Sequence, residues 1–220
     1  MDYRESTWNG YRRLDFEFEG YPAILVLPDT PNEARRLAIK TEYFGAFPDF
    51  EAAMLKRGYT LCFLSHPPRW APDSEVEASA AFLRYVAETY KLETRGIAVG
   101  MSCGGLQAVY FAAKYPDLVS ALYLDAPVMN FLSWPFGMGD CTVRTGESER
   151  KEVLHALGIT QSELLAFRNH PIDKIPTLIE KRIPVVMIYG DSDTVVPYAE
   201  NGYILEKAYR RTDIPFLVQG

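Results

Sequence analysis

An apolar segment from Gly96 to Gly100 runs directly into a second pattern, which alternates apolar and polar residues as a helix does from about 104 to 115. The first segment predicts a buried strand and the second an amphipathic helix. The connection between them is Gly100-Met101-Ser102-Cys103-Gly104, with a further glycine at Gly105. So tight a turn from strand to helix leaves room only for small residues beside its centre. It holds Ser102 in a strained backbone conformation and projects the hydroxyl at the positive end of the helix.

Short apolar runs alternate with helical patterns along the rest of the chain, which is typical of βαβ units and a mostly parallel sheet. The pattern predicts the α/β class: a three-layer αβα sandwich with a mostly parallel, doubly wound sheet. The first strand, at 14–19, is expected at the sheet edge, in a hairpin with 23–27. Further strands are expected at 37–39, 60–64, 96–100, 118–124, 185–189 and 214–218, and helices at 50–56, 74–91, 104–115 and 198–209. Ser74 and Glu77 indicate a capping box at the start of the second helix.

A stretch of about 55 residues between the strands at 118–124 and 185–189 breaks this rhythm. A loop of that length without structure of its own is unusual in a compact domain. We therefore predict a single domain over 1–220 with a small helical cap inserted at about 128–180. One cap helix is expected to end at Gly158 and the next to begin with a capping box at Thr160 and Glu163. The cap aromatics Phe131, Trp134 and Phe136 are candidates for lining a substrate pocket over the sheet's carboxyl edge.

Ser102 is the candidate nucleophile of this turn, because a serine between a buried strand and a helix has the context of a nucleophile elbow. The alternative interpretation, which we consider the weaker one, is an ordinary glycine-rich turn or a nucleotide-binding turn. The spacing of the glycines does not match GxGxxG, and no Gly-Lys-Ser/Thr of a Walker loop is present. Cys103 is a rival nucleophile, but the position two residues before it holds Met101 rather than a small residue. The backbone N–H of Cys103 is instead placed to donate to an oxyanion.

The composition excludes several function classes. Lys plus Arg is 23 and Asp plus Glu is 29, a net charge of -6, so nucleic acid is not an expected partner. No apolar run has the roughly 18 residues of a membrane span. The N-terminus lacks the apolar core of a signal peptide, so a cytoplasmic location is expected. The three cysteines form no CxxC pair, which argues against a disulfide framework or a zinc site. No metal or cofactor is expected.

The sequence resembles the α/β-hydrolase superfamily from about Leu14 to Val218. It is more closely similar to a poorly characterised bacterial group of predicted esterases and peptidase-like hydrolases. The shared segments are residues 41–47 (TEYFGAF), 125–128 (DAPV), 133–135 (SWP) and 190–197 (GDSDTVVP). The resemblance implies the α/β-hydrolase fold and makes Ser102 and Asp193 two members of a catalytic triad. It does not identify a substrate.

Asp193 is the expected acid of the triad. It follows an apolar strand and precedes Val195-Val196-Pro197, as the acid does in many α/β-hydrolases, and a carboxylate there can orient a histidine. Asp191, two residues earlier, is better explained by turn or helix-capping chemistry. Asp125, at the end of the strand after the nucleophile helix, is the second candidate, since some members of the superfamily place the acid there.

The loop after the strand at 37–39 contains Tyr43 and Phe44. In this fold that loop usually supplies the second N–H of the oxyanion hole, and the N–H of Phe44 is the candidate donor. Tyr43 is a candidate for the substrate pocket. The aromatic side chains of the loop are equally consistent with core packing.

No histidine that could act as the general base occurs at the position expected for it, after the acid. In the order typical of α/β-hydrolases the histidine follows the acid, whereas His66, His155 and His170 all precede Asp193. In similar proteins a Gly-His-His-type segment occurs soon after the point corresponding to Gly220. We therefore expect that the C-terminal histidine segment is missing from this chain. A histidine from the cap or from the loop at His66 is the alternative, and so is a protein without catalysis.

These observations lead to two hypotheses. The first is a serine hydrolase of small-molecule carboxylic esters that works through an acyl-enzyme, with peptide or amide cleavage as a variant of the same chemistry. The second is a non-catalytic binding protein on the same fold, since fold alone does not determine function. The oligomeric state cannot be inferred from the sequence.

Overall fold

The computed structural model describes residues 2–142 and 146–220 and shows one sheet with helices on both faces. The described part of the sheet has nine strands in the order β1-β2-β3-β5-β4-β6-β7-β8-β9. Their bounds are β1 (Arg4–Trp8), β2 (Tyr11–Phe18), β3 (Tyr21–Leu27), β4 (Leu37–Lys40), β5 (Thr60–Leu64), β6 (Gly96–Met101), β7 (Val119–Asp125), β8 (Val185–Ile188) and β9 (Phe216–Gln219).

The pairings from β5 through β9 are parallel, whereas β1, β2 and β3 pair antiparallel with their neighbours and β3 pairs antiparallel with β5. The expected hairpin is confirmed, with Leu14 opposite Leu25 in β2 and β3. Its expected position at the sheet edge is wrong, because β1 lies outside β2 with Glu5 opposite Leu14. The sequence of β1, Arg-Glu-Ser-Thr-Trp, has too few apolar residues to be recognised as a strand by its pattern.

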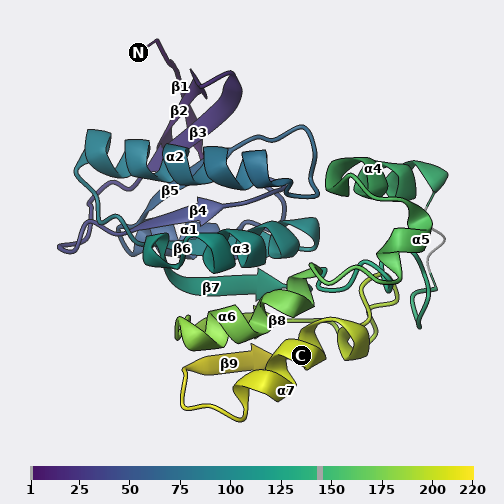
Figure 1. Cartoon of the computed structure of the whole chain (residues 1–220). Helices are drawn as coiled ribbons and strands as arrows, with labels where there is room; N and C mark the ends of the chain where they lie inside the picture. The colour runs from purple at the N-terminus through teal and green to yellow at the C-terminus, as the bar shows by residue number, and fades with distance from the viewer. Residues whose placement is uncertain (1, 143–145) are drawn as a thin grey trace.

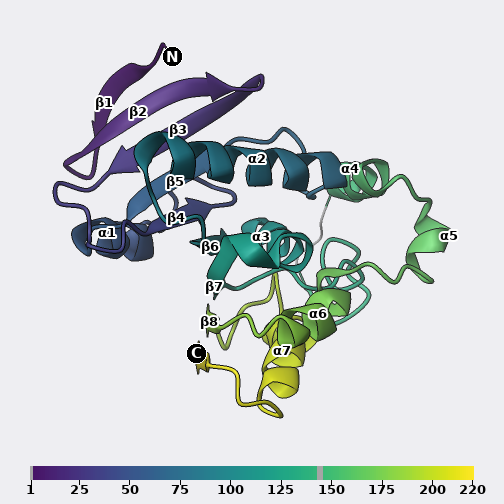
Figure 2. The same cartoon turned by 60° about the vertical axis from the view of Figure 1, so that its left-hand side comes forward.

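The helices divide unequally between the two faces. Among the described helices, α1 lies on one face of the sheet, and α2, α3, α6 and α7 cover the other (Figure 2). Their bounds are α1 (Asp49–Lys56), α2 (Asp73–Tyr90), α3 (Cys103–Lys114), α6 (Ile175–Glu180) and α7 (Gly202–Tyr209). The large core between the sheet and α2, α3 and α7 includes Leu83, Leu106 and Leu205. The predicted three-layer α/β architecture is therefore confirmed.

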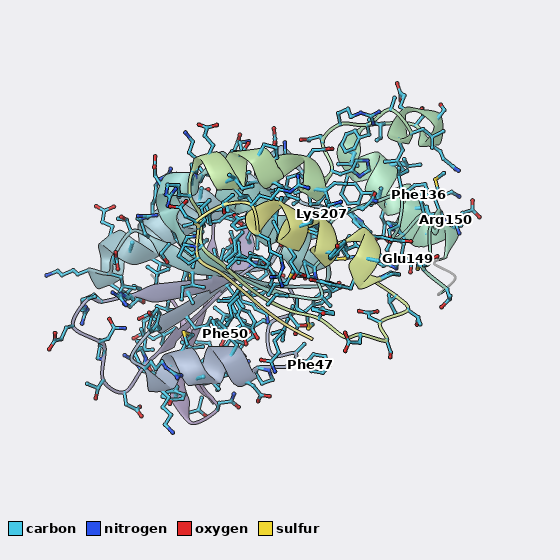
Figure 3. All side chains as sticks on the ribbon, turned by 90° about the horizontal axis from the view of Figure 1, so that it is seen from below. Phe47, Phe50, Phe136, Glu149, Arg150 and Lys207 are labelled. Atoms are coloured by element: carbon cyan, nitrogen blue, oxygen red, sulfur yellow. The ribbon has the colours of Figure 1, made fainter. Side chains whose placement is uncertain are left out.

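A smaller core lies on the α1 face of the sheet. It consists of Val26, Ala38, Leu55, Leu61 and Val99, all about 1% exposed or less. Beside it, the ring of Phe50 from α1 stacks on Tyr123 of β7, with 3.7 Å between centroids. Figure 3 shows Phe50 on this side of the sheet. Successive side chains of a strand point to opposite faces, so the central strands β3 to β6 contribute residues to both cores.

The residues between β7 and β8 carry the short helices α4 (Glu147–Leu157) and α5 (Gln161–Leu164), the 3₁₀ turn η2 (Pro171–Lys174) and α6. Helices α4 and α5 stand apart from the layers, near one end of α2 (Figure 1). Helix α4 ends at Gly158 in the left-handed conformation, and Thr160 and Glu163 form the expected capping box of α5. Of the predicted cap at 128–180, residues 143–145 lie outside the described part.

The capping box expected at Ser74 and Glu77 is wrong. Helix α2 begins at Asp73, directly after Pro72, and no side chain caps its first turn. The proline ends the preceding loop one residue earlier than the sequence pattern indicates, so Ser74 already lies inside the helix.

Within the described residues, no helix combines the length and apolar character needed to cross a bilayer.

Candidate functional site

The turn from β6 to α3 places Ser102 at the carboxyl edge of the sheet. Strand β6 ends at Met101 and α3 begins at Cys103, so Ser102 is the single residue between them. Its backbone has φ +52° and ψ -118°, a sparsely populated conformation for a residue with a side chain. The backbone N–H of Ser102 donates to the Asp125 carbonyl at 2.9 Å, and its carbonyl accepts from Val128 N–H at 3.0 Å. Hydrogen bonds to residues at the end of β7 and just after it therefore hold the strained residue on both its N–H and its carbonyl side.

Two glycines make this turn possible. A Cβ on Gly100 would lie 2.3 Å from the Gly104 carbonyl oxygen, and a Cβ on Gly105 would lie 2.4 Å from Pro127 Cβ. Both contacts are far inside van der Waals distance and the first is to rigid backbone. The glycines thus let the first turn of α3 pack directly against β6 and the segment after β7. The spacing seen in the sequence has this physical cause.

Cys103 is the first residue of α3 and is completely buried. Burial raises the pKa of its thiol to about 11, so the sulfur stays protonated at neutral pH. Tyr43 and Ser102 are close enough to act on the pKa of this thiol, and both oppose the effect of burial. The thiol therefore packs beside Ser102 as a neutral group.

The loop after β4 brings residues 41–43 against the start of α3. Thr41 Oγ1 donates to the Gly104 carbonyl at 2.7 Å, and Tyr43 adopts a left-handed backbone with φ +54°. The two aromatic residues then diverge. Tyr43 reaches toward Cys103, whereas the Phe44 ring packs between Trp8 and Phe63, at centroid distances of 5.3 and 5.4 Å. The side chain of Phe44 is a core group of the α1 face, so any oxyanion role belongs to its backbone N–H alone.

Asp125 is the last residue of β7, and Asp193 lies in the loop after β8. The charge of Asp193 acts on Asp125. Burial raises the pKa of Asp125, and the charges of Glu51 and Asp193 add to the rise, while Lys40 opposes it. Lys40 and Glu51 form an ion pair, and both are only 3% exposed. Asp125 therefore belongs to a buried charge cluster that includes Lys40, which is a structural role that the sequence did not indicate.

Asp193 makes contacts within its own loop. Its Oδ1 accepts from the N–H groups of Val195 and Val196 at 2.8 and 2.9 Å. These bonds leave Oδ2 without a partner among the contacts of that turn and fix the orientation of the carboxylate. The loop lies beside the carboxyl end of β9. Asp191 Oδ1 is 2.9 Å from the point that a Cβ atom would occupy if Gly220 carried a side chain.

The rings of two histidines, His66 and His170, have hydrogen-bond or ion-pair partners other than Ser102. The His66 ring, whose side chain is 4% exposed, pairs through Nδ1 with Glu75, and its Nε2 lies 2.8 Å from Ser79 Oγ. Nδ1 of His170 accepts from the Phe131 N–H at 3.2 Å. His155 is exposed on α4. His66 therefore anchors its loop to α2, and His170 supports the backbone at Phe131.

Acid should destabilise the protein through His170. Burial lowers the pKa of this ring, and its Nδ1 must stay unprotonated to accept from Phe131. An unfolded histidine takes up a proton near pH 6.5 or just below, so the unfolded state binds more protons there. Stability that is present above about pH 6.5 is then lost as the pH falls toward the folded pKa.

We expect that His170→Asn, whose amide oxygen can still accept a hydrogen bond, narrows the difference in melting temperature between pH 7.5 and pH 5.0. The exposed His155→Gln is the control and should keep the wild-type difference. Equal differences for wild type and His170→Asn would contradict this assignment.

The predicted pocket aromatics form a packed cluster. Phe131 is 0% and Trp134 9% exposed. The Trp134 ring stacks on Trp70 at 5.5 Å, and Phe131 contacts Trp70, Phe167 and His170. Their part in a substrate pocket remains a prediction.

Arg69 is a residue near the nucleophile turn that the sequence analysis did not single out. Its guanidinium interacts electrostatically with Tyr43 and Cys103. Gln107 of α3 fixes the loop by donating to the Arg69 carbonyl at 3.2 Å and to Glu42 Oε2 at 2.6 Å. Arg69 follows β5, and loops after the carboxyl ends of parallel strands line the ligand edge of such sheets. This position was the signal that could have identified it.

Comparison with known proteins identifies the fold. A family model described as alpha/beta hydrolase fold matches residues 62–148, from β5 into the start of α4. A puromycin hydrolase superposes on 99% of this chain with a TM-score of 0.70 at 16% identity, but this chain spans only 34% of it. A search of curated protein sequences finds no match.

Smaller proteins superpose over most of their length. An S-formylglutathione hydrolase from Agrobacterium tumefaciens has a TM-score of 0.68 at 14% identity, covering 100% of this chain and 90% of its own. A carboxylesterase from Lactobacillus plantarum has a TM-score of 0.63 at 14% identity, covering 99% and 82%. At these identities the likeness shows the fold alone: the chain has the α/β-hydrolase fold.

Proposed function

We propose that the protein is a serine hydrolase of carboxylic esters with Ser102 as its nucleophile. The strained backbone of Ser102, held between Asp125 and Val128, is the observation that carries the proposal. A serine in an ordinary turn has no need of such a conformation, and backbone strain persists where the surrounding structure enforces it. The names of the structural neighbours, a carboxylesterase and an S-formylglutathione hydrolase, are consistent with ester or thioester cleavage.

In the proposed mechanism the Ser102 hydroxyl attacks the acyl carbon and loses its proton to a base. The carbonyl oxygen becomes an oxyanion, and the backbone N–H groups of Cys103 and Phe44 stabilise it. The N-terminus of α3, a helix of 12 residues, adds a partial positive charge at the same place. Collapse of the intermediate expels the alcohol with the proton from the base. Water then attacks the acyl-enzyme by the same steps and releases the acid.

The base in this proposal is a histidine oriented by Asp193, presented from the side of the site where β9 ends. The position of β9 supports this choice, because its carboxyl end lies beside the loop that carries Asp191 and Asp193. A segment continuing from Gly220 would begin at the edge of the sheet that carries Ser102. Peptide or amide bonds are alternative substrates for the same groups, since leaving-group preference depends on pocket shape.

A non-catalytic binding protein is the second candidate. The observation in its favour is that ring nitrogens of the two buried histidines, His66 and His170, bond to Ser79, Glu75 and Phe131. In this case the elbow would be a structural remnant of the fold, and ligand binding would not depend on the Ser102 hydroxyl.

A fluorophosphonate probe distinguishes the two candidates. We expect the full-length protein to be labelled on Ser102, as identified by mass spectrometry of its peptides, and Ser102→Ala to remain unlabelled. Ser192→Ala, which removes an exposed hydroxyl from the Asp193 loop, is the matched control and should label as wild type does. Absence of labelling in the folded wild-type protein, or equal labelling of Ser102→Ala, would refute the nucleophile assignment.

A further inference from the structure

The loop after β5 is fixed at both ends and in the middle. His66 binds Glu75 and Ser79 on α2, and Trp70 donates from Nε1 to Glu152 Oε2 at 3.3 Å. Between these anchors Gln107 of α3 holds the Arg69 carbonyl. The backbone of Arg69 is therefore placed by three separate elements, as expected for a residue that has to present its side chain in one direction.

The Arg69 guanidinium is oriented by aromatic rings. It lies over Trp70 at 5.1 Å and over Trp134 at 6.0 Å, and these two rings stack on each other. Cation–π contacts of this kind fix the plane of the guanidinium and leave its N–H edge for other partners. Tyr43, on the loop after β4, interacts electrostatically with the guanidinium and with Cys103 beside Ser102. Gln107 of α3 joins the two loops by donating to both the Arg69 carbonyl and Glu42, which precedes Tyr43. The cation is thus linked to the nucleophile turn through the loop that carries Tyr43.

The anionic partner of Arg69 is weakly bound. Glu152 of α4 approaches with an N···O distance of 3.5 Å, and the side chains of Arg69 and Glu152 are 31% and 47% exposed. A bidentate guanidinium–carboxylate pair has shorter bonds, near 2.7–2.9 Å. Glu152 also accepts from Trp70 and from Ser148. A carboxylate with better geometry would therefore compete with Glu152 for Arg69.

We propose that Arg69, together with the Tyr43 hydroxyl, binds a carboxylate of the substrate, so that the preferred substrates are esters that carry a carboxylate near the scissile carbonyl. This inference rests on the proposed function and specifies its substrate class. The fork of the guanidinium matches a carboxylate in shape and charge. Glu152 occupies the anion position when no substrate is present and leaves it when the substrate carboxylate arrives.

Binding without turnover tests this inference separately from catalysis. Calorimetric titration of Ser102→Ala with monomethyl glutarate, an ester with one free carboxylate, is compared with titration by the neutral dimethyl glutarate. We expect the monoester to bind at least about ten-fold more tightly, a difference in the range of one charge-assisted hydrogen bond. Raising the ionic strength should weaken the monoester alone.

Variants assign the effect to Arg69. In the same Ser102→Ala background, Arg69→Gln should remove the preference for the monoester and leave the diester unchanged, and Arg69→Lys should retain part of it. Glu152→Gln should tighten monoester binding because the competing carboxylate is gone. Arg211→Gln, an exposed arginine after α7, is the control and should change nothing.

Equal affinity for the two esters, or an Arg69→Gln variant that keeps the preference with an unchanged melting temperature, would overturn the inference. Labelling of Ser102 by a neutral fluorophosphonate does not involve Arg69. A protein that is labelled but shows no preference for the monoester would therefore refute the carboxylate site alone, whereas an unlabelled protein would refute the proposed function.

Discussion

Replacement of Asp193 by asparagine is expected to lower kcat for ester hydrolysis by about four orders of magnitude, the effect of removing the acid's charge from a Ser-His-Asp triad. The substitution isolates that charge. Asp193 Oδ1 accepts from Val195 and Val196, and the amide oxygen of asparagine can accept the same two bonds. The loop should therefore keep its conformation while the histidine loses the carboxylate that sets its tautomer. Steady-state hydrolysis of an aryl ester by the full-length protein measures the effect.

Asp125→Asn is the matched control, because Asp125 lies at the same edge of the sheet and interacts with Asp193. We expect a much smaller loss of kcat, since the proposed function assigns the role of the acid to Asp193 and Asp125 faces the charge of Lys40. A loss of four orders of magnitude with Asp125→Asn, and little effect of Asp193→Asn, would transfer the role of the acid to Asp125.

Lys40→Met should be the most destabilising of the substitutions considered, by about 3–5 kcal/mol in the free energy of unfolding. Lys40 ends β4 and Glu51 belongs to α1, and their side chains, each 4% exposed, pair beneath the α1 face of the sheet. Removal of the ammonium leaves the Glu51 carboxylate buried without its cation. It also removes the positive charge that offsets the burial of Asp125. Urea unfolding followed by circular dichroism measures the loss.

A double-mutant cycle separates the ion pair from simple packing. We expect Lys40→Met with Glu51→Leu to recover much of the lost stability, since an apolar pair of similar volume leaves no buried charge unpaired. Glu51→Leu alone should destabilise the protein because it leaves the Lys40 ammonium buried without its anionic partner. Additive effects of the two single substitutions would show that Lys40 and Glu51 do not depend on each other.

The local features of this fold could be predicted because each depends on a short stretch of sequence. The β6–α3 turn is specified by glycines within six positions, Gly100, Gly104 and Gly105, each close to another backbone or side chain. The capping box at Thr160 depends on a partner three residues away. Apolar periodicity likewise placed the strands from β2 onward and the helices α1, α2, α3 and α7, whereas α6 was not predicted. In contrast, β1 is polar and is a strand only because β2 offers it an edge.

The features that could not be predicted depend on contacts between distant segments. The Lys40–Glu51 pair forms because β4 lies between β5 and β6 with α1 packed across it, and a strand order of this kind cannot be inferred from periodicity. The same is true of His66, whose environment is set by residues one helical turn apart on α2. Arg69 approaches Tyr43 only because two loops after neighbouring strands meet above α3.

The hydrogen bonds on either side of Ser102 have a consequence for its motion. Its N–H donates to β7 and its carbonyl accepts from both Gly105 and Val128, so the residue cannot relax without breaking bonds to two segments. The backbone that carries the hydroxyl is accordingly ordered when the protein folds, and no loop has to close to place it. Hydrogen exchange at the Ser102 amide should then proceed only through large-scale unfolding, as slowly as at the central strands and far more slowly than in the loops around it.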